Sequence, residues 1–123
     1  MGRMSEALLF DQAVYLDLSS ELGHEDTVEV LKAFLADTSR KMGVMASAVS
    51  DRSMIKREAH SIKSSAATFG FAQLSALARD LEARSETMSA SELCELVEAL
   101  ARLFEETSKL AQAQLLNTDA EIA

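Results

Sequence analysis

The chain of 123 residues contains no proline, only four glycines and a single cysteine, Cys94. Few positions can therefore break a helix, and we expect helices almost throughout. This composition disfavours a β-sandwich or barrel, which needs many Gly/Pro turns, and a disulfide scaffold, which needs paired cysteines. No apolar run approaches the roughly 18 residues of a membrane span, and the apolar stretch at residues 7–10 is too short for a secretory signal. We therefore expect one cytoplasmic domain over residues 1–123, with a frayed end after Leu116.

Positive charge is also scarce, because twelve lysines and arginines face twenty aspartates and glutamates, for a net charge of -8. Such a surface repels phosphate backbones, so we expect no nucleic-acid partner. The sequence has no Gly-rich phosphate loop, no Cys/His spacing typical of zinc sites and no Ser/His/Asp constellation. We expect no metal and no cofactor bound by this chain. Hydrophobic residues make up 48% of the sequence, which is enough for a packed core.

Sparse helix breakers divide the chain into five expected helices, at about Ser5–Leu22, Glu25–Val49, Ser53–Phe69, Phe71–Glu86 and from Ser89 onward. Gly70 is expected to end the third helix, and Ser89 and Glu92 have the spacing of a capping box. Gly43, inside the second helix, is expected to mark close helix packing. Each helix must bury an apolar stripe against the others. The predicted fold class is therefore all-α, an antiparallel four-helix bundle (up-down-up-down) whose short first helix caps one end.

The third helix presents a histidine to solvent. At about 100° per residue, its apolar residues share one face, which comprises Ile55, Ala59, Ile62, Ala66 and Phe69. His60 lies about 140° from the centre of that face. Small and cationic side chains surround it one or two turns away: Lys56, Arg57, Lys63, Ser64 and Ala67. A neutral imidazole nitrogen is a good nucleophile that can carry a phosphoryl group, and cations stabilise the added charge. The alternative interpretation is a solvated surface histidine among solvated lysines.

The run from Arg57 to Glu82 resembles the histidine phosphotransfer (HPt) domain family. It includes Ala59-His60-Ser61-Ile62-Lys63-Ser64-Ser65, then Gly70, and ends in Leu81-Glu82. The resemblance implies that His60 is phosphorylated on Nε2 and that Lys63 lies beside the phosphoryl group and aids its transfer. Ser64 stands where the family usually has glycine. Glu82 stands where some members carry a glutamine that orients the imidazole, and we leave that role open here.

The resemblance further implies a stand-alone bacterial protein of a multistep phosphorelay, expected to be a monomer. It would carry a phosphoryl group between aspartates of response-regulator receiver domains, in a pathway with a hybrid histidine kinase. The receivers would bring Mg²⁺ and would contact Lys56, Arg57, Ser64, Ala67 and Phe71. Phe71 follows Gly70 where the family usually has a small residue, and it is open to two interpretations, a core residue or part of an exposed apolar docking patch. No autokinase activity is expected, so the chain would be a phosphotransfer intermediate rather than an ordinary enzyme.

Two other functions are weighed against this hypothesis. The dimerisation and phosphoacceptor module of a histidine kinase also presents a helical histidine. That histidine is typically followed by Glu and then by Arg/Asn-Thr-Pro, whereas Ser61 follows His60 here and the chain has no proline. An interaction-only helical adaptor would bind receivers without phosphotransfer. The retention of both His60 and Lys63 argues against that loss of chemistry.

Overall fold

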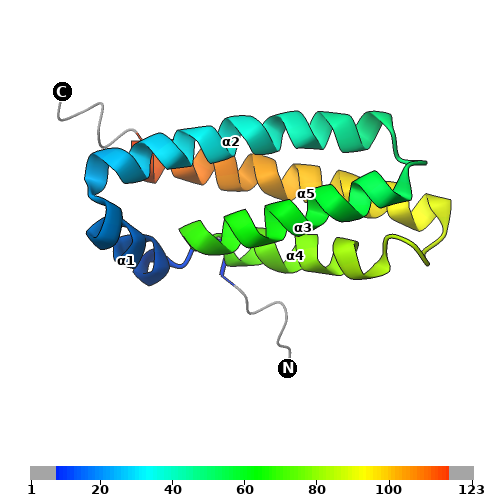
Figure 1. The fold of residues 1–123 in the computed structure, drawn as a ribbon, viewed down its shortest axis with the longest axis horizontal. Coiled ribbons are helices and arrows are strands. Elements are labelled where there is room, and N and C mark those ends of the chain that lie inside the picture. The colour runs from blue at the N-terminus through cyan, green and yellow to red at the C-terminus, as the bar shows by residue number, and fades with distance from the viewer. Residues whose placement is uncertain (1–7, 117–123) are drawn as a thin grey trace.

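The computed structural model describes residues 8–116, which are almost entirely helical (Figure 1). The helices are α1 (Gln12–Leu22), α2 (His24–Ser47), α3 (Arg52–Phe69), α4 (Ala72–Arg84) and α5 (Ala90–Ala111), followed by a π-helical segment, η2 (Gln112–Leu116). The four long helices run in alternating directions, and α1 lies at the end of the bundle where α3 meets α4. This arrangement confirms the predicted all-α bundle with a short N-terminal helix. The frayed end expected after Leu116 lies outside the described residues.

The core is built from apolar stripes that the long helices turn toward one another. Its fully buried members include Leu31 and Met45 of α2, Ile55 and Ile62 of α3, Leu74 and Leu81 of α4, and Leu93 and Leu100 of α5. Burying one such side chain contributes about 1.5–3 kcal/mol relative to leaving it exposed. All five predicted core residues of α3 are buried. The rotation of α3 is thereby fixed, and its opposite face is turned to solvent.

The ends of α3 and the start of α5 follow from local sequence. The Asp51 side chain caps α3 by accepting a hydrogen bond from the backbone N–H of Met54 at 3.1 Å. Gly70 ends α3 in the left-handed conformation, with φ of 89°, as predicted. At the start of α5, Ser89 and Glu92 form the predicted capping box through two reciprocal bonds of 3.1 Å.

The first helix is shorter than predicted. The expected start at Ser5 lies outside the described residues, but residues 8–11 are not helical and α1 begins only at Gln12. The reason is that Asp11 acts as the N-cap of α1 and its backbone N–H donates to the carbonyl oxygen of Gly70 at 2.7 Å. The N-terminal segment is therefore tied to the turn between α3 and α4 instead of continuing the helix.

Three smaller features of the helices differ from expectation. The second helix ends at Ser47 rather than Val49, and the fourth ends at Arg84 rather than Glu86. Gly43 does not mark close packing, because a Cβ built there would meet nothing within 4 Å. Hydrophobic periodicity predicts that a helix forms more reliably than it predicts the residue at which the helix ends.

The interpretation of Phe71 as a docking residue is wrong, because its side chain is fully buried. Its ring lies in an aromatic cluster, with centroids 5.7 Å from Phe10, 5.9 Å from Phe34 and 6.1 Å from Phe69. Each such pair contributes about 0.5–1.5 kcal/mol beyond area burial. The cluster joins the N-terminal segment, α2, α3 and the start of α4. Phe71 therefore fixes one end of the bundle and is not available to a partner.

Replacing Gly70 by alanine is expected to lower the free energy of unfolding by about 1–3 kcal/mol. The new Cβ would have to occupy backbone with φ of 89° and would lie 2.5 Å from the carbonyl oxygen of Asp11. The matched control is Gly43→Ala, at an exposed position near the C-terminal end of α2, which should raise the stability by up to about 1 kcal/mol. Urea denaturation followed by circular dichroism measures both. Equal effects of the two variants would contradict the role of the Gly70 turn.

Candidate functional site

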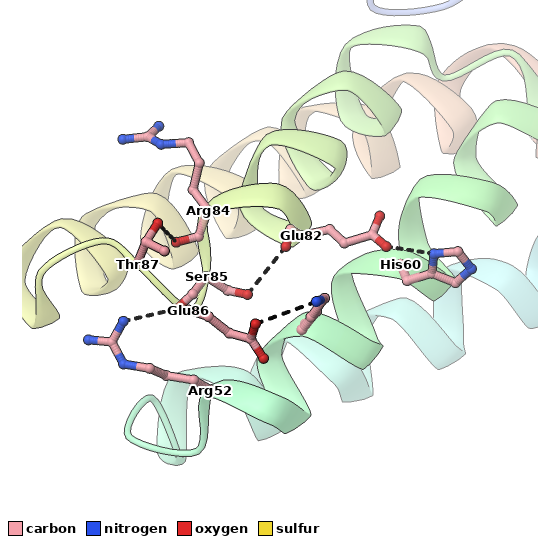
Figure 2. A network of polar contacts seen from close by, with 8 residues as sticks. Arg52, His60, Glu82, Arg84, Ser85, Glu86 and Thr87 are labelled. Carbon is pink, nitrogen blue, oxygen red and sulfur yellow. Dashed lines mark hydrogen bonds and ion pairs between the residues drawn. The ribbon is translucent and has the colours of Figure 1, made fainter.

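The solvent-facing edge between α3 and α4 carries His60 on α3 and Glu82 on α4 (Figure 2). His60 lies opposite the buried stripe of α3, and its side chain is 61% exposed. Glu82 lies near the C-terminal end of α4, which runs antiparallel to α3 after the turn at Gly70. The predicted outward direction of the imidazole is therefore what the structure shows.

The carboxylate of Glu82 binds two residues of α3 at once. Its Oε2 lies 2.8 Å from Nδ1 of His60, and its Oε1 lies 2.8 Å from Nζ of Lys63. An ionised carboxylate only accepts hydrogen bonds, so the contact requires the proton of a neutral ring to be on Nδ1. Nε2 then keeps its lone pair, and Figure 2 shows this second ring nitrogen on the side away from Glu82. The nucleophilic nitrogen of His60 is the one that a partner can reach.

The charge of Glu82 is held in place by its neighbours. The hydrogen bond from Lys63, and after it the bond from His60, keep the pKa of the Glu82 carboxyl below its ordinary value. Glu82 is 21% exposed and Lys63 is 30% exposed, so both side chains are half-buried at the seam between α3 and α4. A negative charge therefore persists next to Nδ1 of His60 throughout the neutral pH range.

The remaining predicted site residues on α3 lie around this centre. Lys56 lies one turn before His60, with its Nζ 3.5 Å from Oε1 of Glu86, and both side chains are about half exposed. Arg57, Ser64 and Ala67 are exposed. A shallow hollow of about 340 Å³ adjoins the imidazole, lined by Ser53, Lys56, Arg57, His60, Glu82 and Glu86. Phe71 is buried away from this site. The other seven of the eight predicted site residues lie on the exposed face of α3 or at the seam between α3 and α4.

Two residues of the site went unnoticed in the sequence. Glu86 follows Glu82 by four residues and lies in the turn just after α4. The four-residue spacing of these two acids is the sequence signal that points to it. Ser75 donates a hydrogen bond from its Oγ to the carbonyl oxygen of Lys63 at 2.9 Å. No sequence pattern points to that bond, since it depends on the geometry of the turn between the helices.

A second set of polar contacts holds α3 from the side of α2. Nζ of Lys41 lies 3.2 Å from Oε1 of Glu58 and 3.2 Å from Oγ of Ser61, two residues that flank His60 in the sequence. Lys41 is only 13% exposed. Together with the contacts of Glu82, these bonds fix the rotation of α3 from both flanks and hold the imidazole outward.

Within residues 8–116, no group of three or more His, Cys, Asp or Glu side chains is placed to hold a metal ion. In the same part of the chain, no helix combines the length and the apolar character that crossing a membrane requires.

Comparison with protein-family models identifies the family of this helical bundle. The family model of the Hpt domain matches residues 29–117, which is well over half of the chain, so the chain belongs to the Hpt domain family. The resemblance seen in the sequence is thereby confirmed. Hpt domains act in histidine phosphotransfer within phosphorelays and interact with receiver domains. Neither the curated proteins nor the solved structures contain a significant match to this chain.

Removing the ammonium group of Lys63 is expected to raise the pKa of Glu82 toward its ordinary value of 4.5. The variant Lys63→Met removes the first cause of the lowered pKa, and His60→Gln, which removes the second, should give a smaller rise. Titration of the Glu82 side-chain carboxyl by NMR measures both. An unchanged titration curve in Lys63→Met would contradict the contact described here.

The same shift has a consequence for acid stability. Because the folded-state pKa of Glu82 is lowered, the stability that its carboxylate contributes is present above the ordinary value and is lost as the pH falls through the folded-state value. The difference in unfolding free energy between the unmodified chain and Glu82→Gln should therefore shrink as the pH falls below the ordinary value of 4.5. Urea denaturation across that range checks the direction.

Proposed function

We propose that this Hpt domain carries a phosphoryl group between the aspartates of receiver domains in a multistep phosphorelay, through phosphohistidine at His60. The observation that supports this most strongly is the state of the imidazole. Its side chain is 61% exposed, and Nδ1 is bound to Glu82 at 2.8 Å, so Nε2 keeps its lone pair. A nucleophile needs both an accessible atom and an available lone pair.

The proposed transfer exchanges one bond for another. In uptake, the Nε2 lone pair of His60 attacks the phosphorus of an aspartyl phosphate. The N–P bond forms, the bond from phosphorus to the aspartate oxygen breaks, and the electron pair leaves with the aspartate carboxylate. Donation to the next receiver is the reverse of these changes. Lys63 would turn part of its hydrogen bonding toward the phosphoryl oxygens, where a cation offsets the added negative charge.

The exposed face of α3 around His60 is the proposed docking surface for the receiver. This helix carries four basic residues and one acidic residue, whereas α5 carries five acidic and two basic residues. In a chain of net charge -8, α3 is thus a local positive face, and it would attract the acidic site of a receiver. Lys56 and Arg57 supply charge, while the short side chains of Ser64 and Ala67 allow a close approach.

We further propose which partners supply the metal ion and the phosphoryl group. Mg²⁺ would be held by the receiver, which supplies the acidic pocket around its aspartate. The phosphoryl group would originate from a hybrid histidine kinase and pass through response-regulator receivers of a bacterial cytoplasmic pathway. The chain would act as a monomer and would not phosphorylate itself, since its sequence has no Gly-rich phosphate loop.

The variant His60→Gln should keep the fold and lose all phosphoryl uptake from a phosphorylated receiver, because the amide nitrogen of glutamine is not a nucleophile. His24→Gln, which removes the other histidine of the chain, should retain uptake. Radioactive label on the chain, tested for acid lability after electrophoresis, measures the transfer. Acid-labile label on His60→Gln would contradict the assignment. Receiver binding by the unmodified chain without any label would indicate an interaction-only adaptor.

The variant Lys63→Ala should slow transfer about tenfold, the effect of one lost charge-assisted hydrogen bond in the transition state. Its unfolding free energy should fall by less than about 1 kcal/mol, since Lys63 is partly exposed and its ion pair is screened. The exposed Lys32 on α2 offers the control, and Lys32→Ala should transfer at the original rate. Rapid-quench kinetics with a phosphorylated receiver measures all three proteins. Equal rates for Lys63→Ala and the original chain would contradict the role of the ammonium group.

A further inference from the structure

The residue that binds Nδ1 of His60 carries a full negative charge, which orientation of the ring does not require. An amide oxygen at position 82 could accept the same hydrogen bond, as glutamine does, and would orient the ring equally well. The structure instead places a carboxylate oxygen 2.8 Å from Nδ1. Orientation of the ring therefore does not account for the charge of Glu82.

The charge matters once Nε2 carries a phosphoryl group. In that state a ring that keeps its proton on Nδ1 is positively charged, and a carboxylate in direct contact stabilises this form. The other charged groups around the ring act from farther away. Lys56, Arg57 and Lys63 on α3 oppose a positive ring, and Glu86, in the turn just after α4, favours it. Lys63 is itself bound to Oε1 of Glu82, which lessens its opposition.

We propose that Glu82 keeps the proton on Nδ1 of phosphorylated His60, so that the imidazole leaves as a neutral group and this domain donates its phosphoryl group rapidly near neutral pH. This inference rests on the proposed function. In donation, the P–Nε2 bond breaks and its electron pair returns to Nε2, while a bond forms from phosphorus to the aspartate oxygen of the receiver. In hydrolysis the bond forms to the oxygen of a water molecule, which releases a proton to solvent. Nδ1 keeps its proton throughout. Without that proton the leaving group would be an imidazolate anion, which is a much poorer leaving group.

Glu82 is suited to this role because it does not take the proton itself. The hydrogen bond from Lys63 keeps the carboxyl pKa of Glu82 below its ordinary value, so the proton stays on the ring. Glu82 touches neither the phosphorus nor Nε2, and it is therefore a positioning residue that acts through His60. Lys63 serves the same end by keeping Glu82 ionised.

The test compares phosphoryl loss from the full chain and from Glu82→Gln. Both proteins are loaded on His60 with phosphoramidate, a small-molecule phosphoryl donor, and hydrolysis is followed by ³¹P NMR between pH 5 and pH 9. Glu82→Gln retains a hydrogen-bond acceptor for Nδ1 but no charge, and both proteins are loaded to the same extent of phosphorylation before hydrolysis is followed. Its pH–rate profile should shift to lower pH by about one unit, which makes loss about tenfold slower on the alkaline side. Identical profiles would overturn the inference while leaving the proposed function intact.

Two controls separate the charge of Glu82 from other effects. Glu98→Gln removes a carboxylate from an exposed position on α5 and should leave the profile unchanged. The shift should also persist when Glu82→Gln is made in a Lys63→Met background. If it vanishes there, the released ammonium group of Lys63 causes the effect and the inference is wrong. If the unmodified chain accepts a phosphoryl group from neither phosphoramidate nor a phosphorylated receiver, the proposed function is wrong, and this inference is wrong with it.

Discussion

The turn at Gly70 is the constraint on which the arrangement of the site depends. A residue with positive φ lets the chain reverse immediately after α3, and the absence of a Cβ lets the backbone of Asp11 approach closely enough to bond the turn. The reversal sets the register between α3 and α4. In that register Glu82 lies beside His60 and Lys63, so a backbone requirement ten residues away decides which side chain meets the imidazole.

The three side chains of the centre are all presented by helices. His60 and Lys63 lie one turn apart on α3, and Glu82 reaches both from α4, so no loop has to close to bring them together. On the opposite flank of α3, Lys41 bonds Glu58, two positions before the histidine, and Ser61, one position after it. Helical residues with packed and hydrogen-bonded surroundings are held more firmly than residues on loops. Such a site is assembled before a partner arrives, and binding need not order it.

Much of this structure could be predicted from the sequence, because the strongest signals are local. The apolar stripe of α3, the cap at Gly70 and the capping box at Ser89 depend on spacings within a few residues. The family motif pointed to His60 and Lys63 in the same way. The register of the helices then brought Glu82 to Nδ1, a contact between positions 22 residues apart that periodicity alone does not reveal.

The errors have a common physical cause. Residues 8–11 were predicted to continue α1, but the turn at Gly70 offers their backbone a competing hydrogen bond. The sequence allows either a surface or a core position for Phe71. Its ring is buried because it packs against the rings of Phe10, Phe34 and Phe69. In each case the outcome depends on what distant parts of the chain supply after folding. Local propensity cannot contain that information.

The pairing of two α3 cations with Glu82 of α4 and with Glu86, just after α4, has a consequence for selectivity. Lys63 is matched by Glu82 and Lys56 by Glu86, so the positive face around the imidazole is partly neutralised by the protein itself. Long polyanions such as RNA bind through many uncompensated charges and the release of their counterions. A face whose cations already have carboxylate neighbours offers little of that gain. Such a face favours a compact partner whose own acidic groups can replace these carboxylates as partners of the cations. It disfavours nonspecific binding to negatively charged polymers.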